Sequence, residues 1–115
     1  MNYDTVAAIS TAQGKGGIGV IRISGDDALR IADKIFNSVS GKKVTEMKGY
    51  TASFGKISED GEDIDEAVAL VFKAPHSYTG EDVVELSCHG GLYITKRVLR
   101  AVLNAGAVPA QAGEF

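Results

Sequence analysis

Two charged residues, Arg22 and Glu85, stand in the middle of segments whose other residues predict β-strands. Period-two alternation puts Arg22 on one face of the segment 18–24, and it puts Glu85 on the same face as Ser87 in the segment 83–88. A strand carboxylate accepts two parallel N–H bonds from an amidine-like edge, and a neighbouring arginine meets a carbonyl oxygen or a carboxylate. Together the two side chains suit a heterocycle with a 2-amino-oxo edge and an acidic tail.

A simpler interpretation of the same two residues is a partly exposed ion pair between neighbouring strands. Such a pair contributes only about 0–1 kcal/mol to stability. The alternation of the strands by itself favours this ion pair, because it gives no sign of a ligand. The residue types leave both interpretations open.

A glycine-rich run, Gly14 to Gly19 (GKGGIG), matches the spacing G-x-G-x-x-G. A dinucleotide fingerprint also needs a helix directly after the run, whose N-terminus receives the pyrophosphate. The residues that follow here, Val20 to Ser24, predict a strand, and no Lys-Ser or Lys-Thr completes a P-loop. We therefore expect a glycine-rich connection between strands rather than a phosphate site.

His76, Cys88 and His89 are the residues that could be imagined as metal ligands. They lack the paired C-x-x-C or H-E-x-x-H spacing of metal sites, so we predict no metal site and place Cys88 in the core. Ser77, Thr79 and His89 are close in sequence, but nothing fixes a nucleophile–base geometry, so we predict no catalytic residue in this chain. The pair Glu81-Asp82 fits a solvated turn.

Length and composition indicate one ordinary globular domain over residues 1–115, with 44% hydrophobic and 23% charged residues. The net charge of −3 argues against direct nucleic-acid binding by this chain, because phosphate neutralisation needs a basic surface. The single cysteine, the absence of a signal-like start and the absence of a membrane-length apolar run predict a cytoplasmic location without membrane association.

The order of the patterns predicts an α+β fold, a mixed β-sheet with two main helices. The first helix follows a capping-box-like start at 24–27 and runs through Phe36, and the second covers 92–104 and stops before Gly106. Helical spacing gives each an apolar face, which comprises Leu29, Ala32, Ile35 and Phe36 in the first and Leu92, Thr95, Val98, Leu99, Val102 and Leu103 in the second. An acidic turn centred on Asp60-Gly61 predicts a hairpin, and 37–47 is expected to be a loop. The expected strands are 5–11, 18–24, 50–57, 66–73, 83–88 and 107–110.

Four ordered stretches of the chain resemble the N-terminal domain of the MnmE (TrmE) family of tRNA modification GTPases. They are 4–11 (DTVAAIST), 16–25 (GGIGVIRISG), 75–91 (PHSYTGEDVVELSCHGG) and Gly113-Glu114-Phe115. The resemblance runs from near the start to the last residue. Ala112 departs from it, since the family usually has proline before Gly-Glu-Phe.

The resemblance implies a domain similar to the tetrahydrofolate-binding domain of aminomethyltransferases, which binds 5-formyl-tetrahydrofolate or a related folate and forms a homodimer. Carried over residue by residue, it assigns folate contacts to Arg22 and Glu85, and it places a further basic contact beyond Phe115. It thereby reverses the preference for a plain ion pair.

For the full-length protein, the resemblance implies a helical domain and a GTPase domain beyond this chain, using GTP, magnesium and potassium. That protein modifies the wobble uridine of tRNA with an FAD-containing partner, while this chain alone is expected to be non-catalytic. Two alternatives stay open: a self-sufficient folate-dependent one-carbon transferase, and a dimerisation module without ligand.

Overall fold

Alternating apolar residues build the protein core on one face of a seven-stranded sheet. The computed structural model describes residues 4–10, 18–74 and 80–110. The strands are β1 (Val6–Ile9), β2 (Gly19–Ser24), β3 (Phe36–Ser38), β4 (Thr51–Glu59), β5 (Glu62–Phe72), β6 (Val83–Cys88) and β7 (Val108–Pro109). They lie in the order β3-β4-β5-β6-β2-β1-β7. Every neighbouring pair is antiparallel except β1 and β7, so the predicted mixed α+β sheet is confirmed.

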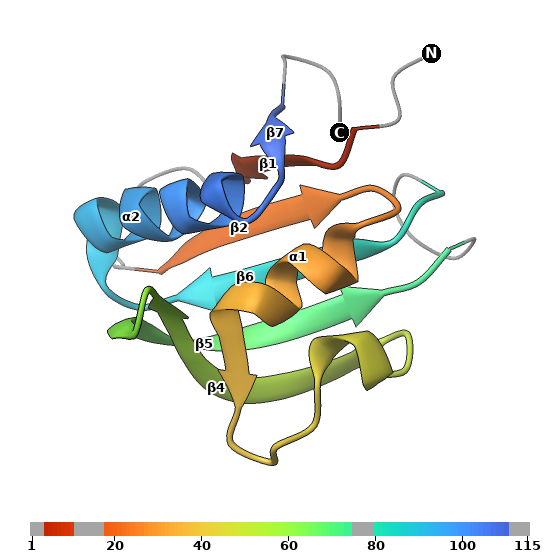
Figure 1. Ribbon diagram of the computed structural model, residues 1–115, viewed down its shortest axis with the longest axis horizontal. Coiled ribbons are helices and arrows are strands. Elements are labelled where there is room, and N and C mark those ends of the chain that lie inside the picture. Colours follow the sequence, from red (N-terminus) through yellow and green to blue (C-terminus); the bar gives the residue numbers. More distant parts are fainter. Residues whose placement is uncertain (1–3, 11–17, 75–79, 111–115) are drawn as a thin grey trace.

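Two helices, α1 (Ala28–Ile35) and α2 (Gly91–Asn104), lie side by side over the same face of the sheet (Figure 1). The side chains that they cover come from the alternate positions of the central strands, as period two requires. These buried residues are Ile21 and Ile23 of β2, Val84, Leu86 and Cys88 of β6, and Ala67, Ala69 and Val71 of β5. None of the described helices is long and apolar enough to cross a membrane.

The start of α1 differs from the predicted capping box. Asp27 is the N-cap residue, but its side chain makes no capping hydrogen bond. Its backbone N–H instead donates to Oγ1 of Thr5 at 3.0 Å, so a side chain from before β1 holds the entry to the helix. The predicted apolar face of α1 is confirmed, since Leu29, Ala32 and Ile35 are buried.

The segment 37–47, predicted as a loop, contains regular structure. The short strand β3 pairs with β4 around Gly55, and a 3-10 turn, η1 (Val44–Glu46), follows it. The backbone N–H of Val44 donates to Oδ1 of Asp33 at 2.8 Å, and Val44 and Met47 are buried. Because two buried residues are too few to show a period, the prediction for this segment was wrong.

The hairpin between β4 and β5 turns at Asp60 and Gly61, as predicted. Both residues have positive φ, 52° and 82°, which is the condition for the tight turns that suit strand twist. In α2, Thr95, Val98 and Val102 are buried as expected. Leu92 is 45% exposed, so its predicted place on the apolar face was wrong.

The packing of α2 on the sheet depends on a close approach to β2. A Cβ atom added to Gly19 would lie 2.3 Å from Oγ1 and 2.6 Å from Cγ2 of Thr95, which is fully buried. Thr95 cannot turn away freely, because its hydroxyl donates to the carbonyl oxygen of Gly91 at 2.7 Å. Only a residue without a side chain lets this helix rest on this strand.

We expect Gly19→Ala to lower the free energy of unfolding by about 1–3 kcal/mol, as overpacking of a core does. Chemical denaturation measures it. Gly49→Ala is the matched control, because a Cβ there would lie 3.4 Å from the nearest atom, Cβ of Lys73, an ordinary contact. Thr95→Ala should recover part of the loss in the double variant. Equal stability of the Gly19 and Gly49 variants would contradict the close approach.

Candidate functional site

Arg22 and Glu85 lie on the face of the sheet opposite the two helices, which we call the open face. The register of the strands makes them direct cross-strand partners, with Leu70 of β5 next in the same row and Ala8 of β1 on the other side. The predicted period of both strands is confirmed, because the apolar neighbours of each charge point into the core instead. Two central strands thus bring two charges together in the middle of the sheet.

The two side chains form an ion pair that is partly shielded from water. Nε of Arg22 donates to Oε2 of Glu85 at 2.9 Å, and Nη2 of Arg22 lies 2.7 Å from the same oxygen. The side chains retain 25% and 15% of their exposure. Both contacts use one carboxylate oxygen, so Arg22 orients Glu85 without occupying the whole carboxylate.

The second carboxylate oxygen, Oε1 of Glu85, accepts no hydrogen bond from the described residues. No described side-chain oxygen or nitrogen is both buried and without a partner, so this oxygen is reached by solvent. Oε2 already accepts two guanidinium nitrogens, which use both of its lone pairs. The carboxylate can therefore accept N–H groups from an incoming molecule at Oε1 while Arg22 stays in place.

The rows of the open face on either side of the ion pair differ in accessibility. Toward one side lie Ser24, Val83 and Phe72, which retain 3%, 0% and 9% exposure. Toward the other side lie Val20, Ser87 and Val68, which are all half-buried, and Phe54 of β4 continues this row at 44% exposure. The row that contains Val83 is thus closed to solvent, whereas the row that contains Ser87 forms a partly accessible and mostly apolar strip.

The connection from β5 to β6 begins and ends close to this face, and Asp82 fixes its ends. Oδ1 of Asp82 accepts the backbone N–H of Ala74 at 2.9 Å, and the carbonyl oxygen of Asp82 accepts the N–H of Gly25 at 3.0 Å. The prediction that Asp82 belongs to a solvated turn was therefore incomplete, since this residue ties three segments together. His76, Ser77 and Thr79, named in the sequence analysis, lie outside the described residues.

The junction between β6 and α2 is held by Asp65 of β5. Oδ2 of Asp65 accepts the backbone N–H of His89 at 2.7 Å and of Gly90 at 3.0 Å. The carboxylate therefore lies against the N-terminal end of α2, where the helix dipole favours negative charge. Sequence reasoning missed this role, because Asp65 is one of six acids in the segment 59–66.

Cys88 is fully buried under α2, as predicted. Burial, with a smaller contribution from the Asp65 carboxylate, raises the pKa of the Cys88 thiol from 9.0 to about 12. His89 is exposed, and its ring Nδ1 lies 3.4 Å from the carbonyl oxygen of Glu66. The described residues contain no group of three or more His, Cys, Asp or Glu arranged to hold a metal ion.

The glycine-rich run ends at Gly19, the first residue of β2, so a strand and not a helix follows it. The prediction of a strand after the glycine-rich run, which was the reason for rejecting a dinucleotide-binding fingerprint, is therefore confirmed. Residues 14–17 of the run lie outside the described residues.

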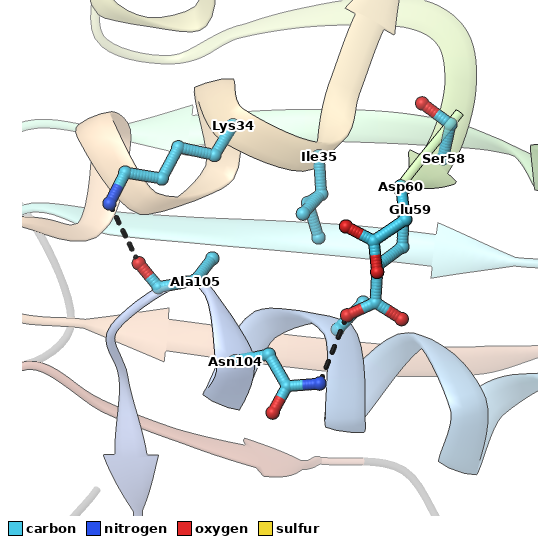
Figure 2. Close-up of a pocket in the computed structure, with 8 residues that line it drawn as sticks. Lys34, Ile35, Ser58, Glu59, Asp60, Asn104 and Ala105 are labelled. Atoms are coloured by element: carbon cyan, nitrogen blue, oxygen red, sulfur yellow. Dashed lines mark hydrogen bonds between the residues drawn. The ribbon is translucent and has the colours of Figure 1, made fainter. Parts of the chain in front are cut away.

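A hollow of about 370 Å³ lies on the helix side of the molecule, between the ends of the two helices and the β4–β5 hairpin (Figure 2). Two hydrogen bonds cross it: Nζ of Lys34 donates to the carbonyl oxygen of Ala105, and Nδ2 of Asn104 donates to Oε2 of Glu59, each at 3.0 Å. The first bond joins the ends of the two helices and the second joins α2 to the hairpin, which makes the hollow a structural junction. Neither Arg22 nor Glu85 lines it.

Fold and geometry together define a class: a small α+β domain with helices on one sheet face and an oriented carboxylate on the other. A family profile described as the GTP-binding protein TrmE N-terminus matches residues 5–115. The chain belongs to this family.

Relatives of the chain carry the name tRNA modification GTPase MnmE. The protein of Symbiobacterium thermophilum is 52% identical over 116 residues, which cover 100% of this chain and 25% of the relative. The protein of Clostridioides difficile is 48% identical over 112 residues, which cover 97% and 24%. The chain therefore spans about a quarter of the length of the curated relatives it matches.

The buried thiol makes stability depend on alkaline pH. Because the folded state holds the Cys88 pKa at about 12, unfolding above pH 9 releases a proton from this thiol. Its stabilising contribution is complete below about pH 9 and is lost as the pH rises toward 12. We expect Cys88→Ala, although less stable overall, to show a smaller fall in the free energy of unfolding between pH 8.5 and 10.5, about 1.4 kcal/mol less per pH unit above the unfolded pKa. Parallel falls in both proteins, measured by urea titration, would contradict it.

Proposed function

We propose that this chain is the folate-binding and dimerisation domain of a tRNA modification GTPase. The observation that carries the proposal is the Arg22–Glu85 pair on the open face, where Arg22 orients the carboxylate and leaves Oε1 within reach of solvent. A reduced folate fits this arrangement, because its pterin ring presents an amino group and a ring N–H side by side. Both can donate to one carboxylate.

The apolar strip beside the pair supports a flat ligand. Leu70, Val20 and Val68 are half-buried and surround the charges on the open face. Their contact with a ring excludes water from the ion pair, and this strengthens the hydrogen bonds to the carboxylate. A planar heterocycle with polar atoms along one edge has this combination of a flat apolar surface and donors.

The same surface supports the proposal of a homodimer. Arg22 and Glu85 lie on the face of the sheet that the two helices leave uncovered, and the exposed Phe54 lies on the same face. A second copy laid on the open face would add a surface opposite the pair and would cover Phe54. Isologous pairing of identical faces is the commonest way in which such small domains associate.

At the level of the whole protein, we propose a GTPase that acts with an FAD-containing partner on the wobble uridine of tRNA. The names of the relatives support the GTPase and the tRNA modification. In this proposal parts of the protein beyond this chain bind GTP, magnesium, potassium and tRNA. This chain binds the folate and makes the dimer contact, and the whole protein acts in the cytoplasm.

The folate site is tested by titrating the chain calorimetrically with 5-formyl-tetrahydrofolate. Glu85→Gln replaces one acceptor oxygen with a donor that faces a ligand donor, and we expect it to weaken binding by about 2–4 kcal/mol. Arg22→Ala should weaken binding as well, since it removes the guanidinium that orients the Glu85 carboxylate. Neither variant should change the free energy of unfolding by more than about 1 kcal/mol, the usual contribution of a partly exposed pair.

The control for this titration is Glu62→Gln, the same chemical change at an exposed glutamate of β5 that pairs with Arg97 of α2. It should leave the folate affinity unchanged. If Glu85→Gln binds folate as tightly as Glu62→Gln and the unmodified chain, Glu85 is only a sheet-surface residue and the proposed site is wrong.

Self-association is tested by sedimentation at high micromolar concentration, where we expect a dimer. Phe54→Glu should shift the chain toward monomer, because it puts a charge on the open face. Leu92→Glu, at 45% exposure on α2 against 44% for Phe54, is the matched control and should remain dimeric. A purely monomeric unmodified chain would count against the dimer, and equal effects of both variants would count against the open face as the interface.

A further inference from the structure

Ser87 lies on the open face two residues along β6 from Glu85, between Val20 of β2 and Val68 of β5. Two residues of a strand span about 6.6 Å, so Ser87 stands within the length of a bicyclic ring from Glu85 along the strand. Its neighbours in the row are apolar, which makes it the polar group of this strip. The sequence pattern already put Ser87 on the face of Glu85, but gave it no role.

The direction in which a ligand can extend from Glu85 is set by the burial of its two neighbours on β6. Val83 is fully buried and its row is closed, whereas Ser87 is half-buried in a row that stays open. A bicyclic ring whose donor edge meets Glu85 therefore finds accessible surface for its second ring over Ser87. The row of Val83 offers almost no accessible surface for the opposite orientation.

The Ser87 hydroxyl is available to such a ligand. No hydrogen bond joins it to another described residue, although it is half-buried on a strand. No described side-chain polar atom is both buried and unpaired, so this hydroxyl is reached by solvent. A hydroxyl in this state can donate to a carbonyl oxygen without first breaking a bond inside the protein.

We propose that Ser87 is a specificity-determining residue that donates a hydrogen bond to a carbonyl oxygen on the second ring of the ligand held by Glu85. This inference rests on the proposed folate site and deepens it. It predicts selection among one-carbon states: a formyl group carries the carbonyl oxygen that Ser87 recognises, and a methyl group at the same nitrogen does not. The apolar Val20 and Val68 on either side leave the hydroxyl as the group that distinguishes the two.

The experiment compares 5-formyl-tetrahydrofolate with 5-methyl-tetrahydrofolate by calorimetric titration of the full chain. We expect Ser87→Ala to weaken formyl-folate binding about 2- to 10-fold, the effect of one neutral hydrogen bond, and to leave methyl-folate binding unchanged. Ser87→Thr keeps the hydroxyl and suits a strand, so it should retain the preference for the formyl ligand. Ser53→Ala, a half-buried serine on the helix side of β4, is the control and should bind both ligands as the unmodified chain does.

The possible results separate the inference from the proposed function. Loss of formyl binding alone supports the role of Ser87. Equal loss for both ligands, or no loss for either, overturns that role while Glu85-dependent folate binding still upholds the site. A chain that binds neither folate overturns both.

Discussion

The antiparallel register between β2 and β6 is the constraint on which the rest of the structure depends. The same pairing that sets Arg22 against Glu85 also sets Ile21 against Leu86 and Ile23 against Val84 in the core. Because side chains alternate between faces, a slip of one residue would turn one strand over, burying its charge and exposing its apolar set. Core formation and site formation are therefore one event in this sheet.

How much could be predicted from the sequence follows from how many residues carry each signal. The strands around Ile21 and Leu86 and the helix containing Val98 were predicted, because each shows several periods of alternation or of helical spacing. β3 and η1 were missed, because they depend on tertiary contacts: Phe36 and Val44 are buried by neighbours distant in the chain. The capping of α1 was wrong for the same reason, since Thr5 supplies the acceptor from another element.

The candidate site shows the same division. Alternation alone put Arg22 and Glu85 on equivalent faces of two strands, and the register that makes them partners is confirmed by the structure. The use of a single oxygen, Oε2, by both guanidinium nitrogens could not be predicted, because it depends on the side-chain conformations. The low exposure of the row that contains Val83 could not be predicted either, since it depends on which segments cover that part of the sheet. The role of the pair in folate binding stays a prediction.

The carboxylate of Asp65 at the start of α2 has a consequence for what this domain can recognise. A helix start with glycines, such as Gly90-Gly91, is the kind of place where proteins commonly bind phosphate groups. Here a negative charge of the chain itself already lies against it and accepts two backbone N–H groups. A phosphate arriving there would meet a like charge and compete for donors that are taken. The glycines at the start of α2 thus serve the packing of the chain on itself, because its own carboxylate takes the position that a bound phosphate would need.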